Sequence, residues 1–174
     1  MKNKKILFTI VVFTILTSCL LILGYKKVNN KFAERGVQET LVKPNQLVKT
    51  KNVDFMVKKT EITKNTNQVK VYITLALRLK HKSDFGFHKN NNNFYENTWL
   101  NIPYGLSSPT ERVWEQNGKK LTQREIDRFK QQNVKIEFDT TKTEIKNKNA
   151  PVRFSFLIPN KQYYEKYSML IPDL

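Results

Sequence analysis

The feature that most constrains this 174-residue chain is a run of strict alternation at residues 69–80. Every second side chain in this run is aliphatic, namely Val69, Val71, Ile73, Leu75, Leu77 and Leu79. The intervening positions are mostly polar or charged, which gives a period of two. A helix has a period of 3.6 and cannot place these six side chains on one side. The run therefore predicts a long strand with one buried face.

Shorter alternating runs predict further strands at residues 53–57, 134–138, 152–158 and 163–171, the last of which ends at Pro172. The Asn-Thr-Asn-Gln cluster at residues 65–68 has turn chemistry, so the first run and the long strand are predicted to form a hairpin. No internal repeat is visible in the sequence. The pattern predicts an antiparallel arrangement.

The middle of the chain carries two local signals. Asn117 and Gly118 stand between short apolar pairs and predict a second hairpin turn. Thr122 and Glu125 have the spacing of a capping box, which predicts one short helix that extends to about Gln132. Together with the strands, this predicts a mainly β domain, an antiparallel β-sandwich with one short helix.

The N-terminal region indicates a membrane. Residues 6–24 contain no charged side chain and are flanked on both sides by lysines. A helix of about 20 apolar residues can cross the hydrocarbon core of a bilayer. The sequence therefore predicts a cytoplasmic N-terminus at residues 1–5, a transmembrane helix or signal anchor at residues 6–24, a tether at residues 25–51, and the β-sandwich at residues 52–174. Lysine-led N-termini favour the cytoplasm, so the β domain is expected outside it.

Because of Cys19, the sequence allows this segment to be either cleaved or retained. Residues 16–19 read Leu-Thr-Ser-Cys, which resembles a bacterial lipobox with Cys19 as the lipidated residue. The residues after Cys19 remain apolar, which instead favours an uncleaved anchor with Cys19 inside the helix. A cleaved secretory signal is a third alternative, although no A-x-A-like site follows Gly24.

The composition excludes several kinds of chemistry. A single cysteine excludes a disulfide framework and a cysteine-rich zinc site. His81, Asp84 and His88 lie close together, but two histidines without a third ligand at metal spacing favour a polar loop. The asparagines at residues 90–93 predict a solvated loop. No nucleophile or phosphate-loop motif is present, so we expect no enzyme activity, no cofactor and no metal.

Four aromatic side chains cluster between the long strand and Pro109, namely Phe94, Tyr95, Trp99 and Tyr104, and Trp114 follows soon after. An exposed aromatic cluster of this kind predicts a binding surface. The alternative is a lid over one end of the sandwich core.

The chain is strongly basic, with 31 Lys and Arg against 15 Asp and Glu and a net charge of +16. Such a balance favours anionic partners. Most of the cations are scattered lysines, whereas proteins that read bases rely on arginine, so no nucleic acid is expected. The expected partners are the membrane, crossed once, and an envelope protein or an anionic wall polymer.

The anchor, the strand at residues 69–80, the hairpin at residues 115–120 and the strand at residues 152–159 together resemble a family. It comprises the small immunoglobulin-like domains that Gram-positive-type bacteria tether to the outer face of the membrane. The resemblance implies no catalytic residues. It predicts a non-enzymatic, membrane-anchored extracytoplasmic domain for binding or assembly. The alternatives are a structural subunit of a secretion or conjugation machine, and an immunity-type or lipoprotein surface protein.

Overall fold

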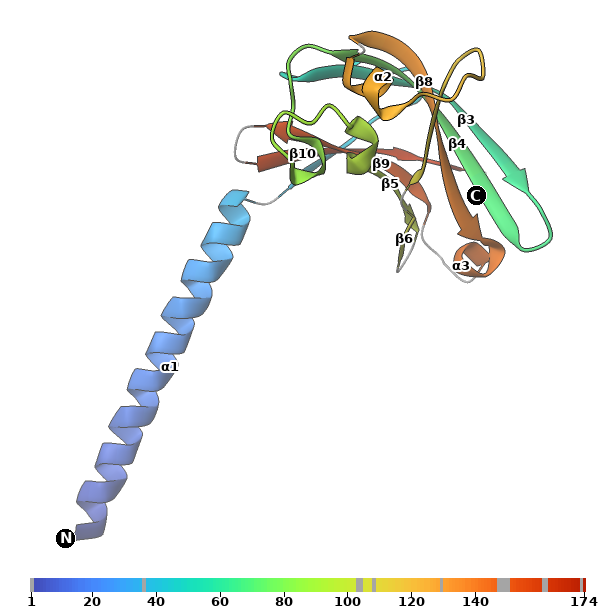
Figure 1. Cartoon of the computed structure of the whole chain (residues 1–174). Helices are drawn as coiled ribbons and strands as arrows, with labels where there is room; N and C mark the ends of the chain where they lie inside the picture. The colour runs from blue at the N-terminus through green and yellow to red at the C-terminus, as the bar shows by residue number, and fades with distance from the viewer. Residues whose placement is uncertain are drawn as a thin grey trace. The chain divides into compact units, whose positions relative to one another are not determined.

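The computed structural model describes residues 2–35, 37–102, 105–107, 109–128, 130–146, 151–160, 163–172 and 174. The chain divides into two compact units, Met1–Gly36 and Val37–Leu174. The first unit holds helix α1 (Lys2–Arg35), and the second holds the strands and the short helices (Figure 1).

Helix α1 is longer than the apolar run that predicts it. Its segment Ile10–Lys27 is long and apolar enough to cross a membrane, and none of that segment is buried. The hydroxyl of Thr14 donates to the carbonyl oxygen of Ile10 at 2.9 Å, and Thr17 bonds Phe13 in the same way at 2.8 Å. These bonds satisfy the hydroxyls within the helix, so the two threonines are compatible with an apolar surrounding.

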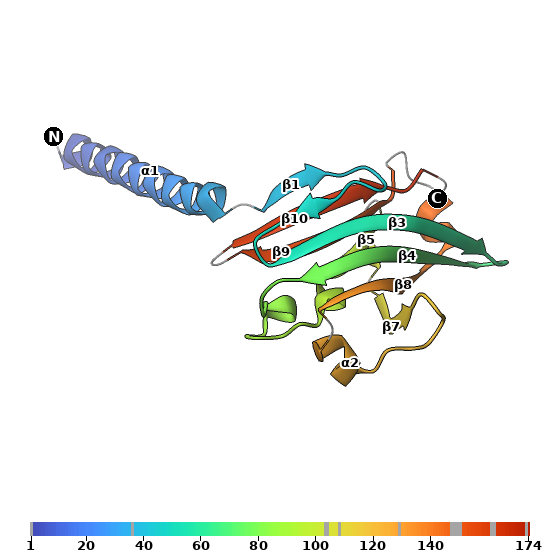
Figure 2. The same cartoon turned by 90° about the horizontal axis from the view of Figure 1, so that it is seen from above.

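The second unit is built from two five-stranded sheets, which confirms the predicted β-sandwich (Figures 1 and 2). One sheet, called the β9 sheet below, has the order β1 (Gln38–Leu41), β10 (Tyr163–Leu170), β9 (Arg153–Asn160), β5 (Thr98–Ile102) and β6 (Gly105–Ser107). The other, the β4 sheet, has the order β2 (Val48–Lys49), β3 (Val53–Lys64), β4 (Gln68–Leu79), β8 (Gln131–Thr141) and β7 (Pro109–Glu115). Neighbouring strands are antiparallel except β1 and β10, which are parallel.

The alternating run at residues 69–80 forms β4, in the centre of its sheet. Its aliphatic side chains point inward, and the predicted hairpin with β3 is present. The N–H of Asn65 donates to the carbonyl oxygen of Gln68 at 2.9 Å and closes the turn. The second hairpin is also present. The N–H of Gly118 donates to the carbonyl oxygen of Glu115 at 3.0 Å, and Gly118 itself has a φ of +86°. The glycine thus occupies the left-handed position of a three-residue loop.

The core lies between the sheets and is rich in phenylalanine. The fully buried phenylalanines are Phe55, Phe85, Phe94, Phe138, Phe154 and Phe156. The ring of Phe55 contacts Phe156 edge-on at 5.1 Å between centroids and Tyr167 at 5.5 Å. A buried aromatic side chain typically removes about 150–250 Å² of surface from contact with water. These phenylalanines therefore dominate the packing energy of the core.

The compact β unit begins at Val37, and residues that the sequence assigns to a tether contribute two of its strands. β1 pairs with β10, and β2 pairs with β3 through Val48 and Lys49. All four side chains of β1 are exposed, and besides its main-chain hydrogen bonds the Glu39 carboxylate pairs with Lys166 at 3.2 Å and Arg153 at 3.7 Å. A four-residue strand of this kind leaves no alternation in the sequence.

Two short α-helices occur in the described part of the β unit, where the sequence predicts one. In α2 (Gln123–Arg128) the N–H and the hydroxyl of Thr122 both donate to Glu125, as the capping box predicts. The helix ends before Gln132 because Gln131 starts β8. The additional helix, α3 (Lys142–Lys146), has the same Thr-x-x-Glu spacing at Thr141 and Glu144, a signal that the sequence did offer.

Candidate binding site

The aromatic residues predicted to form one surface do not form one, although the rings of Phe94 and Tyr95 meet edge-on at 6.3 Å between centroids. Phe94 begins the 3₁₀ turn η2 (Phe94–Asn97) and is fully buried, so its assignment to a binding surface is wrong. Trp99 alternates with buried residues on β5, and Trp114 on β7 meets the ring of Tyr72 edge-on at 6.3 Å, which places the two tryptophans on the outer faces of different sheets. Tyr95 is half-buried and packs against the core. Tyr104 lies outside the described residues.

The segment that carries Phe94 closes one end of the core, as the lid alternative predicts. Its first turn, η1 (Phe85–Phe87), buries Phe85, which stacks on Phe156 at 6.0 Å. Asn97 joins the segment to the sheet: its amide nitrogen donates to the Leu157 carbonyl oxygen at 2.9 Å, and its oxygen accepts from the Gly86 N–H at 2.6 Å. The segment is held by polar bonds, which explains its asparagine content.

The predicted solvated loop at residues 90–93 is partly wrong. Asn93 is buried, and its amide nitrogen donates to the Glu96 carboxylate. Asn91 bonds the Phe85 carbonyl oxygen at 2.9 Å and Glu96 at the same distance. These amides replace the main-chain partners that an irregular segment lacks.

His81, Asp84 and His88 are all exposed side chains in this segment. The Asp84 carboxylate accepts the N–H of Asn90 at 2.8 Å, so it stabilises the turn. Among the described residues, no group of three or more His, Cys, Asp and Glu side chains could hold a metal ion.

The middle of the outer face of the β4 sheet is covered by paired charges. Glu61 bonds Lys135 at 3.0 Å and Lys59 at 3.1 Å, and these bonds lower the pKa of Glu61. The Lys135 ammonium also lies 4.5 Å from the centre of the Tyr72 ring. Lys70 bonds the buried Glu137 carboxylate at 2.7 Å, which raises the pKa of Lys70. Since each described cation here has an anionic partner, this region is a poor site for an external anion.

A groove of about 720 Å³ lies toward the other end of the same face. It crosses β2, β3, β4 and the start of β8. The groove contains the small side chain of Ala76, and it lies beside the register shift of β3 between Val57 and Lys59. The lining residues are Leu47, Lys49, Asp54, Met56, Lys58, Ala76, Leu77, Arg78, Gln131, Gln132 and Asn133.

The groove is cationic. Lys49, Lys58 and Arg78 are exposed, and none of them forms an ion pair with a carboxylate in the described ranges. The only carboxylate among the lining residues, Asp54, lies 2.5 Å from the Lys80 ammonium and is thereby compensated. Amide side chains of β8 line the opposite side and can donate hydrogen bonds. The groove can therefore hold an anionic group between cations and amides.

Sequence reasoning missed this site for a simple reason. Lys49 lies in the predicted tether, Lys58 at an irregular position of β3, and Arg78 on the outer face of β4. These residues share no spacing, so only the pairing of three strands brings them to one groove.

Comparison with known proteins supports the fold. No family model matches the chain, and no curated protein is similar to it in sequence. A crystal structure of an uncharacterized β-sandwich protein from Clostridium difficile 630 is similar, with a TM-score of 0.55 and 14% identity. The match covers 78% of this chain and 95% of that chain. At this identity the likeness shows a β-sandwich.

Proposed function

We propose that this protein is a membrane-anchored, non-enzymatic binding domain that lies outside the cytoplasm and holds a polyanion of the cell envelope. The observation that carries the proposal is the groove in which Lys49, Lys58 and Arg78 meet without anionic partners among the described residues. The apolar helix α1 supplies the anchor in this proposal. The immunoglobulin-like relationship belongs to the same proposal and is supported by the two sheets, which are antiparallel except for the β1–β10 pair.

The chemistry of the groove favours a flexible phosphate-bearing wall polymer. A single chain can enter a concave site, whereas a flat bilayer surface contacts only its rim. The lining residues include no aromatic side chain on which a base could stack, which disfavours single-stranded nucleic acid. Two lysines and one arginine act mainly as point charges, which suits a repeating phosphate without sequence information.

The test compares two triple variants of the full chain in detergent micelles. The groove variant carries Lys49→Ala, Lys58→Ala and Arg78→Ala. The control carries Arg112→Ala, Lys120→Ala and Arg124→Ala, three exposed cations that do not line the groove, so both variants lose the same charge. Binding is measured to poly(glycerol phosphate) and to phosphatidylglycerol vesicles.

The groove variant should lose affinity for the polymer by roughly tenfold, the sum of three exposed ion pairs, and the control by less than twofold. Equal losses in both variants would show diffuse attraction to a basic protein and overturn the groove assignment. Because α1 is present in every variant, vesicle binding that falls in the groove variant but not in the control, without binding to the polymer, would assign the groove to lipid headgroups instead.

The location is tested by protease treatment of intact cells, with Cys19→Ala beside the wild type. The proposal expects the β unit to be removed in both. Identical behaviour of the two chains would indicate an uncleaved helix, and a larger unprocessed form of Cys19→Ala would indicate a lipoprotein. Protection of the β unit even after wall removal would contradict the proposed location.

A further inference from the structure

Half of strand β3 forms an open sheet edge. β2 pairs with β3 only at Phe55 and Asp54, and the Asn45 N–H adds one bond to the Val57 carbonyl oxygen. Beyond that point, no strand in the described part of the chain pairs with residues 59–64 on the side away from β4. In both views β3 lies on the far side of β4 from β8 (Figures 1 and 2).

The register of the hairpin identifies the main-chain groups on this edge. The bond from the Asn65 N–H to the Gln68 carbonyl oxygen makes these two residues a hydrogen-bonded pair. Hydrogen-bonded and non-hydrogen-bonded pairs alternate along an antiparallel ladder. The N–H and C=O groups of Lys64, Ile62 and Thr60 consequently point away from β4, toward the open edge.

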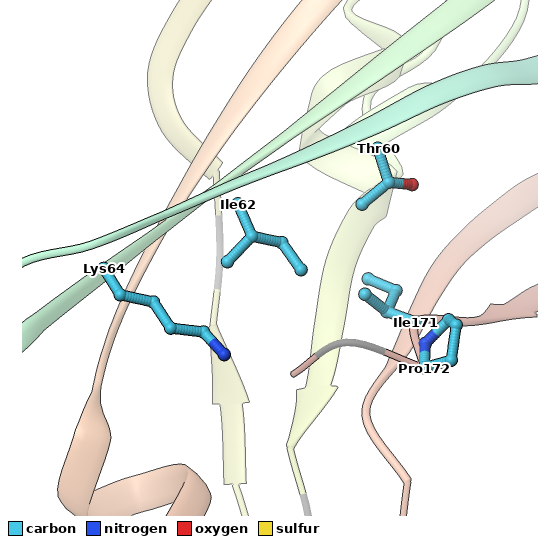
Figure 3. Close-up of a pocket in the computed structure, with 5 residues that line it drawn as sticks. All are labelled: Thr60, Ile62, Lys64, Ile171 and Pro172. Carbon is cyan, nitrogen blue, oxygen red and sulfur yellow. The ribbon is translucent and has the colours of Figure 1, made fainter.

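The same three residues line a pocket between the sheets. It has a volume of about 360 Å³ and is completed by Ile171 and Pro172, which follow β10. Figure 3 shows Thr60, Ile62 and Lys64 projecting from one side of β3 toward Ile171 and Pro172. Ile62 is half-buried and Ile171 is buried, and they form an aliphatic part of the wall beside the polar groups of Thr60 and Lys64. Main-chain groups that point away from β4 and a pocket with an aliphatic part thus coincide.

We propose that residues 59–64 of β3 bind an extended, acidic segment of a partner protein, which adds a strand to the β4 sheet. Main-chain bonds to Thr60 and Ile62 would hold the segment, and one apolar side chain of the segment would contact Ile62 and Ile171 in the pocket. This combination of ladder bonds and side-chain pocket is the general mode of strand addition. The inference goes beyond the proposed function and does not depend on the groove.

The charge of the β unit selects an acidic partner over a second copy. Residues 37–174 contain 24 Lys and Arg against 14 Asp and Glu. On the edge itself the carboxylate of Glu61 is already bonded by Lys59 and Lys135. Two β3 edges would bring like charges together, which is how lysines prevent self-pairing of sheet edges. A negatively charged strand meets no such repulsion.

The test begins with amide hydrogen exchange, measured by NMR on the full chain in detergent micelles. The probe is an acetylated nine-residue peptide in which Glu and Val alternate. Without the peptide, the amides of Thr60 and Ile62 should exchange quickly, and with saturating peptide they should slow at least tenfold. Protection already present without peptide, or dependent on protein concentration, would overturn the inference in favour of a covered edge or a second copy.

Variants then separate the edge from general attraction. Thr60→Pro removes one outward N–H, a substitution that edge strands tolerate, and should weaken peptide binding about tenfold. Ile62→Ala tests the pocket without changing the main chain and should weaken it at least threefold. Thr63→Ala, whose side chain is exposed on the other face, is the matched control and should change binding less than twofold.

Two further controls keep the outcomes distinct. A peptide that alternates Lys and Val should not bind, and equal binding of both peptides would overturn the acidic preference. The groove variant described above should bind the Glu-Val peptide as the wild type does. Loss of peptide binding in the groove variant, with full binding in Ile62→Ala, would assign the peptide to the groove and overturn the edge site.

Discussion

Helix α1 and strand β4 are both rich in aliphatic residues, yet they bury them in opposite ways. In α1 the side chains of Phe13 and Leu21 are 72% and 69% exposed. In β4 the inward side chains from Val69 to Leu77 are at most 2% exposed. The same aliphatic residue types are therefore buried in the β unit and exposed on the helix. The β unit thus completes its own core, whereas the segment Ile10–Lys27 of α1 leaves its apolar side chains exposed and is apolar enough to cross a membrane.

The physical reason is the distribution of polar residues. β4 alternates apolar and polar side chains, so one face can turn inward while the other meets water. The apolar run of α1 has no polar face, which is typical of a helix surrounded by lipid. The predictions below test this division, beginning with the helix.

The largest expected effect comes from charges in the helix. The double variant Phe13→Asp with Leu20→Asp should lose about 2.5–3.5 kcal/mol of insertion free energy for each substitution. This loss should move the chain out of the membrane fraction. The thermal unfolding of the β unit should not change. Phe13→Leu with Leu20→Ile is the control and should stay in the membrane fraction. If the charged variant also stays there after carbonate extraction, the contrast between a lipid-facing α1 and a self-contained β unit is wrong.

The second effect is the converse, a cavity in the β unit. Phe156→Ala removes a buried ring that contacts Phe55 and Phe85, and should lower the free energy of unfolding by about 3–5 kcal/mol. Membrane retention should be unchanged. Leu106→Ala, at a side chain that is 71% exposed, should cost less than about 0.5 kcal/mol in the same denaturant titration.

A smaller effect is expected at the capping box. Thr122→Ala removes the hydroxyl that bonds Glu125 at the start of α2, and should cost about 1 kcal/mol. Chemical denaturation of the β unit measures it, with Thr63→Ala as the exposed control. An equal loss in both variants would show that the cap does not stabilise the helix.

The smallest effect concerns pH. Hydrogen bonds from Lys135 and Lys59 lower the pKa of Glu61, and bonds from Lys119 and Thr122 lower the pKa of Glu125 to about 2. The unfolded chain therefore binds more protons below pH 4.5, and the β unit should lose stability as pH falls through that range toward 2. Glu61→Gln should flatten this dependence slightly, as followed by thermal unfolding. The segment Ile10–Lys27 contains no acidic residue, so its helicity should not respond.

Much of the fold could be predicted because its signals are local. Alternation predicted β4 and its partners, and Asn65 and Gly118 marked turns that the structure contains. The candidate site was far less accessible. The five aromatic residues formed a cluster in the sequence, but burial removed Phe94 and the two tryptophans went to different sheets. Sequence proximity does not determine which face of which sheet a residue occupies.

The sequence by itself determined the apolar helix, the long central strand and the basic charge, because each follows from residue type and a short period along the chain. The tertiary structure alone decided the parallel pairing of β1 with β10, the groove at Arg78 and the open edge of β3. These features depend on hydrogen bonds and contacts between segments far apart in the chain. A local pattern carries no information about such partners, since the partner is selected by the packing of the whole sandwich.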